Sequence, residues 1–132
     1  MEISATVRNS QRAHEVVVRT GVVAQTLDVA AKPTGRGSAV NGGEFLMLAL
    51  ATCYCNDLYR EAERLGIPLE GVEVEASAQF PGVGLAATGI RYRASVSSSA
   101  PPSAIAELLR KTDAVAEVHN TIRAGLPVEL VV

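Results

Sequence analysis

The segment over residues 44–65 reads EFLMLALATCYCNDLYREAERL and contains neither proline nor glycine. Ser38 or Asn41 can cap the N-terminus of a helix that begins here, because short polar side chains accept hydrogen bonds from the first free N–H groups. Gly66 and Pro68 follow the segment directly and are typical of a helix end. The segment therefore predicts one long helix over 44–65, with a length of roughly 33 Å.

This predicted helix has two unlike halves. Residues 45–55 are apolar on every side, whereas residues 57–64 are amphipathic. A helix that is apolar all round has to be covered on all sides. One small sheet can cover only one of those sides, so we expect a second copy of the chain to cover the other. The sequence thus predicts a homodimer.

Alternating apolar and polar residues on either side of the helix predict β-strands. Two more helices are expected near the C-terminus, one beginning at Pro101-Pro102 and a short one over 116–124. The order βββ-α-ββ-αα-β gives an α+β fold, in a single domain over residues 1–132. The expected strands cover residues 2–8, 14–19, 22–30, 72–80, 88–97 and 127–132.

The composition excludes several classes of protein. Hydrophobic residues make up 48% of the chain and charged residues 20%, as in a globular protein rather than a disordered one. The net charge is -2, aromatic residues are 4% and no long basic run occurs, so no nucleic-acid partner is expected. The longest apolar run, 45–55, is far shorter than the roughly 20 residues that span a bilayer, so no membrane partner is expected.

Both cysteines of the chain, Cys53 and Cys55, lie in the long predicted helix. They are about 200° apart around its axis, so they cannot bridge each other without unwinding it. Two thiols this close do not form a disulfide framework and, with no secretory leader evident, they predict a cytoplasmic protein. Cys55 shares a stripe with apolar residues and is interpreted as a small core side chain.

Cys53 is different because it lies where the helix surface changes from apolar to polar. Asp57 lies one turn further on and Arg60 two turns. Two interpretations are open. Cys53 packs in the core as a small apolar side chain, or it is a reactive thiol beside a pocket and a cation, a setting that lowers the pKa of a thiol.

The sequence predicts no metal and no cofactor. Cys-x-Cys supplies two ligands of the three or four that a metal site needs, and only His14 and His119 could add to them. The glycines over 35–43 do not follow a nucleotide-binding strand pattern, and no Gly-Lys-Ser/Thr comes after them. A flexible loop is the better interpretation of that stretch.

Two runs of sequence, NGGEFLMLALATC over 41–53 and AERLGIPLEGVEV over 62–74, resemble the OsmC/Ohr superfamily. Members of that family place a glutamate near the start of an apolar helix, a cysteine further along it, and a Gly-Ile-Pro-Leu-type exit into an alternating strand. The run HNTI over 119–122 resembles the family's later loop–helix segment. The resemblance therefore extends over almost the whole chain.

The resemblance implies an intertwined homodimer with the long helices packed centrally between sheets. It also implies thiol-dependent reduction of organic hydroperoxides, with an external thiol as reductant. In this sequence Cys53 would be the thiol that attacks the peroxide, and Glu44 would hold the cation that activates it. Arg36 and Lys32 lie in the stretch where that cation is expected, and Arg36 is our candidate.

The chain departs from the family at the second cysteine, because the matching run over 116–122 is AEVHNTI and Ala116 stands at the resolving position. One hypothesis is a one-cysteine peroxidase that uses Cys53 and an external thiol. His119 could serve as the base for Cys53, or be a structural histidine. The other hypothesis is a non-catalytic dimeric binding protein, with a small apolar ligand in the pocket between the subunits.

Overall fold

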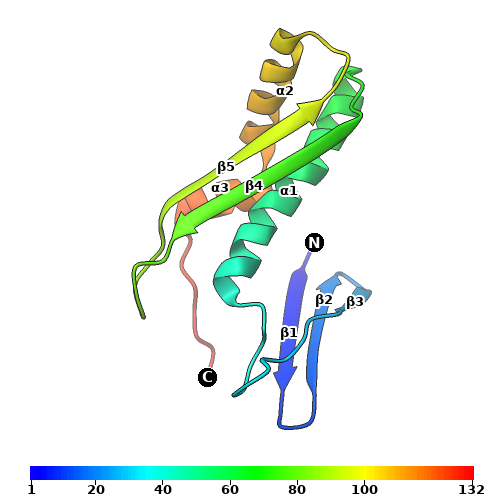
Figure 1. Cartoon of the computed structure of the whole chain (residues 1–132). Helices are drawn as coiled ribbons and strands as arrows, with labels where there is room; N and C mark the ends of the chain where they lie inside the picture. Colours follow the sequence, from blue (N-terminus) through cyan, green and yellow to red (C-terminus); the bar gives the residue numbers. More distant parts are fainter. The chain divides into compact units, whose positions relative to one another are not determined.

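The computed structural model describes residues 1–132 and confirms an α+β fold with three helices and antiparallel sheets (Figure 1). The chain divides into two compact units, Met1–Phe45 and Leu46–Val132. The elements follow the predicted order up to the third helix. No helix has the length and apolar character needed to cross a membrane.

The first unit is a three-stranded antiparallel sheet in the order β1-β2-β3. Its strands are β1 (Ile3–Asn9), β2 (His14–Thr20) and β3 (Val23–Leu27). The alternating segments predicted these strands, but β3 is shorter than expected at both ends. It ends where Leu27 faces Val16, because the Val29 N–H turns back to the Leu27 carbonyl and leaves the ladder.

Helix α1 (Gly42–Leu65) begins with a capping box. The Glu44 N–H donates to Asn41 Oδ1 over 2.8 Å, and the Asn41 N–H donates to Glu44 Oε1 over 3.0 Å. The helix ends at Gly66, whose φ of +69° is favourable for glycine, and the Ile67 N–H returns to the Ala62 carbonyl. Of the two predicted caps, Asn41 is the one used.

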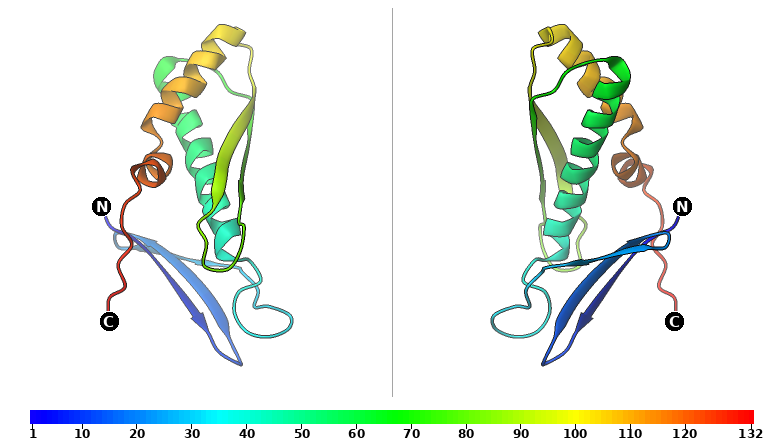
Figure 2. Two further views of the ribbon diagram at one scale, coloured as in Figure 1. Left: turned by 90° about the vertical axis from the view of Figure 1, so that its left-hand side faces the viewer. Right: turned by 90° about the vertical axis from the view of Figure 1, so that its right-hand side faces the viewer.

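The second unit packs helices onto one face of a hairpin (Figure 2). Strands β4 (Gly71–Gln79) and β5 (Thr88–Ser97) are antiparallel, with Glu75 facing Arg93. Helices α2 (Pro102–Val115) and α3 (Glu117–Ala124) follow. The core forms where α1 and α2 meet the inner face of the hairpin, and its buried members are Tyr54, Leu58, Ala62, Leu108 and Ala116.

One expectation from the sequence is wrong for the single chain, and another, that this chain covers only one side of the apolar half of α1, agrees with the structure. Residues 127–132 form no strand, because a strand needs a neighbour and no strand of this chain pairs with them. The apolar half of α1 is covered on one side only, since Leu50 is 2% exposed and Leu48 is 57% exposed. These two residues lie about 200° apart around the helix, so the face opposite the core remains open.

Candidate functional site

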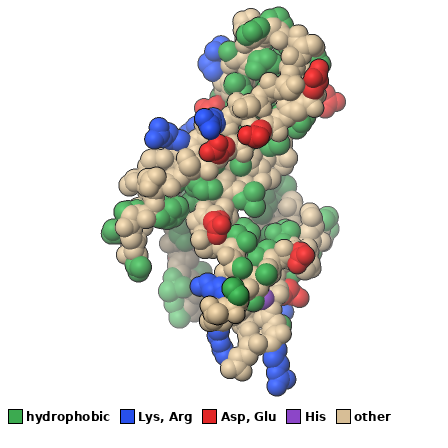
Figure 3. Space-filling model, viewed as in Figure 1, with side chains coloured by type: hydrophobic (Ala, Val, Ile, Leu, Met, Phe, Trp, Pro, Cys, Tyr) green, Lys and Arg blue, Asp and Glu red, His purple; other side chains and the backbone are tan.

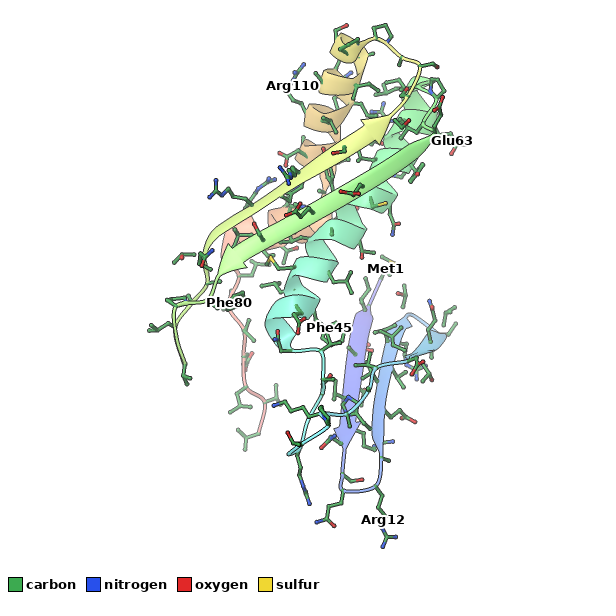
Figure 4. All side chains as sticks on the ribbon, viewed as in Figure 1. Met1, Arg12, Phe45, Glu63, Phe80 and Arg110 are labelled. Carbon is green, nitrogen blue, oxygen red and sulfur yellow. The ribbon has the colours of Figure 1, made fainter.

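The thiol of Cys53 lies at the edge of the buried face of α1. Figure 4 labels Phe45 and Glu63 near the two ends of this helix. Cys53 is half-buried against the core of the second unit, and both cysteines are free. The Cys53 Sγ–H donates a hydrogen bond to Asp57 Oδ2 over 3.7 Å. The two residues are one turn apart on the same face of α1. Cys53 therefore packs on the core and also makes one polar contact, with a carboxylate rather than a cation, and its reactivity stays a prediction.

Asp57 is a buried carboxylate that connects the thiol to an arginine. It is 4% exposed, and its Oδ1 accepts a hydrogen bond from Arg60 Nη1 over 2.7 Å. The Arg60 Nε lies 3.8 Å from Glu61 Oε2. The positive charge of Arg60 is thus directed at the two carboxylates rather than at the sulfur. Arg60 is therefore already paired and is not a free cation beside Cys53.

The pKa of Cys53 is raised above its ordinary value. Burial is the largest cause, and the negative charges of Asp57 and Glu117 act in the same direction. A hydrogen bond from the backbone of Val118 opposes them. Within this chain the thiol is therefore protonated at neutral pH, and a further cation is needed to activate it.

The start of α3 covers the thiol. Cys53 Sγ and one carboxylate oxygen each from Asp57 and Glu117 lie within 4.8 Å of one another. Ala116, directly before this helix, is fully buried in the core that Cys53 contacts. Both oxygens of Asp57 already accept hydrogen bonds, so the group is an acid–thiol cluster rather than a set of free metal ligands.

His119 lies on α3 and packs against two tyrosine rings that also contact each other. The centroid of the His119 ring lies 4.4 Å from that of the Tyr92 ring and 5.8 Å from that of the Tyr54 ring. Burial, and secondly the charge of Arg123, lower the pKa of His119, so its imidazole is neutral at neutral pH. Its aromatic contacts favour the structural interpretation, and catalysis by this ring stays a prediction.

A polar network that the sequence did not predict surrounds these rings. The Tyr92 hydroxyl donates to Asp113, which also accepts from Arg123 Nη2 over 2.7 Å. The Tyr54 hydroxyl donates to the Leu109 carbonyl, and burial raises the pKa of Tyr54 to about 12. In the sequence, the only indication of this network was the inward position of Tyr92 in its alternating strand. Its partners lie on other elements, which no local pattern connects to that strand.

The remaining predicted site residues belong to the first unit. Glu44 is exposed, and its carboxylate serves in the capping box at the start of α1. Arg36 and Lys32 are exposed in the loop between β3 and α1, where the Lys32 N–H donates to the Gly37 carbonyl. The activating function of Arg36 and Glu44 stays a prediction.

Replacing Asp57 with asparagine is expected to lower the pKa of Cys53, because it removes a negative charge and leaves only a neutral, weaker acceptor for the thiol hydrogen. The thiolate fraction at neutral pH then rises, and alkylation by iodoacetamide accelerates roughly three- to tenfold. Samples quenched at successive times and analysed by peptide mass give the alkylation rate of Cys53 alone. Glu63→Gln, on the exposed side of the same helix, is the matched control and should leave it unchanged. A slower rate in Asp57→Asn would mean that the carboxylate assists deprotonation.

Comparison with known proteins identifies relatives of this fold. The family model described as OsmC-like protein matches residues 35–131, and no curated protein matches significantly. The solved OsmC-like protein from Mycoplasma pneumoniae has a TM-score of 0.65 and 18% identity, covering 92% of this chain and 86% of that chain.

Two further solved structures are described as organic hydroperoxide resistance proteins. The Legionella pneumophila protein has a TM-score of 0.63 and 19% identity, covering 93% of this chain and 90% of its own. The Elizabethkingia anophelis protein has a TM-score of 0.62 and 19% identity, with 93% and 89% covered. At these identities the likeness concerns the fold.

Proposed function

The chain belongs to the OsmC-like protein family, and on this premise we propose that it reduces organic hydroperoxides through Cys53. The observation that carries the proposal is the free thiol at the junction of α1 and α3, with its hydrogen bonded to the buried Asp57. The hydroperoxide resistance proteins of the same fold support it. The family model crosses the boundary between the two units, which supports a single domain over 1–132.

Reduction of the hydroperoxide proceeds in three steps. The thiolate of Cys53 attacks one peroxide oxygen, the O–O bond breaks, and the organic part leaves as an alcohol after taking up a proton. Cys53 is then a sulfenic acid. An external thiol condenses with it to a mixed disulfide and releases water, and a second thiol releases Cys53 as the disulfide of the reductant forms.

The chain uses one cysteine in this cycle. Ala116 stands where the family's resolving cysteine is expected, and Cys55 lies about 200° from Cys53 around the helix. The external thiol therefore acts directly on the sulfenic acid. Activation of the thiol is assigned to Arg36, held by Glu44, as the family resemblance implies, since Arg60 is already bonded to Asp57. Both cysteines of the chain are free thiols, which is the state expected in the reducing cytoplasm.

We further propose that the working molecule is a homodimer. Hydrophobic side chains are open to solvent in both units (Figure 3). Leu48 is 57% exposed on the bare face of α1, and the C-terminal Val128 and Leu130 are 99% and 85% exposed. Large apolar side chains left open to solvent in such number favour an interface, and these residues are the candidates for it. A second copy would cover the open side of α1 and give residues 127–132 a strand to pair with.

The second candidate function is a dimeric binding protein without catalysis. The raised pKa of Cys53 favours it, because a protonated thiol reacts slowly with peroxides. In that case the pocket between the two subunits would hold a small apolar ligand, and Cys53 would be a packing residue. The two candidates differ in what a hydroperoxide does to the native protein.

Treatment of the native protein with cumene hydroperoxide is expected to add one oxygen atom to Cys53, which a sulfenic-acid trap and peptide mass analysis can locate. Cys55→Ser is the matched control and should be oxidised at Cys53 at an unchanged rate. Cys53→Ser should gain no oxygen. Oxidation no faster than that of free cysteine, or only after denaturation, would reject the peroxidase and leave the binding protein.

A further inference from the structure

Two carboxylates lie beside the sulfur of Cys53, one on each of the helices that meet there. An oxygen of Asp57 on α1 and an oxygen of Glu117 on α3 lie within 4.8 Å of Cys53 Sγ and of each other. After burial, these two negative charges raise the pKa of the thiol, and no positively charged side chain opposes them. A molecule that reaches the sulfur therefore comes close to negative charge.

The two carboxylates differ in how far their charge is compensated. Asp57 is 4% exposed and accepts a hydrogen bond from Arg60 Nη1 over 2.7 Å, so a cation is held against it. Glu117 is exposed and forms no ion pair with any arginine, lysine or histidine of the chain. The uncompensated negative charge beside the thiol is therefore that of Glu117, the carboxylate that solvent reaches.

Two other cations of the site are compensated in their turn. Arg123, on the same helix as Glu117, is paired with Asp113 over 2.7 Å. Arg36 is assigned to the thiol together with Glu44, and this pair would bring one charge of each sign. The excess of negative charge beside the thiol therefore remains when the activating pair is present.

The position of Glu117 also favours helix α3 itself. An acidic side chain in the first turn of a helix is stabilised by the positive end of the helix dipole. That contribution is the same whatever molecule approaches the sulfur. An effect of Glu117 on the reaction can therefore be separated from its effect on the helix, because only the first depends on the charge of the reactant.

On the basis of the proposed function, we propose that Glu117 is a specificity-determining residue that repels reactants with a negative charge close to the reacting atom. Cys53 then reacts preferentially with uncharged hydroperoxides. Repulsion between two charges about 5 Å apart at a protein surface slows a reaction roughly three- to tenfold. Glu117 takes part in no covalent step, so the bonds that form and break are those of the hydroperoxide reduction.

Alkylation of Cys53 in the full chain measures this selectivity without any hydroperoxide. Iodoacetamide and iodoacetate are nearly equal in size, and only iodoacetate is charged. The ratio of their rates at Cys53, divided by the same ratio for 2-mercaptoethanol, should be roughly three to ten. Both reagents attack the same thiolate, so a change in the pKa of Cys53 cancels in this ratio. Raising the salt from about 0.05 M to about 0.5 M should bring the ratio closer to one.

Glu117→Gln is the decisive variant, because it keeps the shape of the side chain and removes its charge. The ratio should fall close to one. Glu63→Gln is the matched control and should keep the native ratio, since it changes the net charge equally at an exposed position that does not act on the thiol. The proposal is overturned if the native ratio is close to one, if iodoacetate is the faster reagent, if Glu117→Gln keeps the ratio, or if Cys53 reacts with neither reagent.

Cumene hydroperoxide and its para-carboxylate derivative test the substrate class. The uncharged compound should oxidise Cys53 roughly two- to fivefold faster in the native protein, and Glu117→Gln should reduce that difference. Equal oxidation by both compounds would overturn this inference and leave the peroxidase standing. Oxidation by neither would reject the peroxidase, and the alkylation ratio would still decide the effect of Glu117.

Discussion

Placing a charge at position 48 is expected to separate the dimer into single chains. In the single chain Leu48 is 57% exposed and lies about 200° around α1 from the buried Leu50. If a second copy covers that face, Leu48→Glu puts an unpaired carboxylate into an apolar interface. Leaving a buried charge without a partner costs about 3–5 kcal/mol, which weakens association more than a hundredfold.

Light scattering on a sizing column measures this directly. The native protein should have about twice the chain mass of 13.8 kDa, and Leu48→Glu should have the mass of one chain. Val83→Glu is the matched control, because Val83 is fully exposed between β4 and β5 and should leave the dimer intact. A native protein that elutes as a single chain, or a Leu48→Glu variant that remains dimeric, would remove the dimer from the proposal.

Local signals in the sequence predicted the elements that depend on neighbouring residues. Asn41 and Glu44 form the capping box because both partners lie within one turn, and Gly66 ends α1 through its own backbone freedom. The alternating segments predicted β4 and β5 for the same reason, since alternation marks a half-buried face. Such features need no knowledge of the rest of the molecule.

Features that depend on distant partners could not be predicted in this way. Alternation over 127–132 indicated a strand, but a strand forms only where another strand offers its edge. Residues Cys53, Asp57 and Arg60 were all identified on α1. Their spacing did not reveal that the arginine bonds to the carboxylate and that the carboxylate raises the pKa of the thiol. His119 and the two tyrosine rings against it come from three different elements, and no local pattern joins them.

Ala116→Cys is expected to restore a two-cysteine cycle. Ala116 is fully buried in the core that Cys53 contacts, and the two next residues of α3, Glu117 and Val118, act directly on the pKa of Cys53. After hydroperoxide treatment the new thiol should condense with the Cys53 sulfenic acid to a disulfide. The bond closes a loop of more than sixty residues, so it should stabilise the oxidised protein by about 4 kcal/mol.

Denaturant unfolding of the oxidised and reduced variant measures this gain, and peptide mass analysis locates the bond. Ala106→Cys, exposed on α2, is the matched control and should form no bond with Cys53. If Cys53 is oxidised in Ala116→Cys but no disulfide follows, position 116 does not face the sulfur and the family alignment of α3 is wrong. If the bond forms, position 116 faces the sulfur, and the missing cysteine explains why an external thiol rather than an internal one has to react with the sulfenic acid.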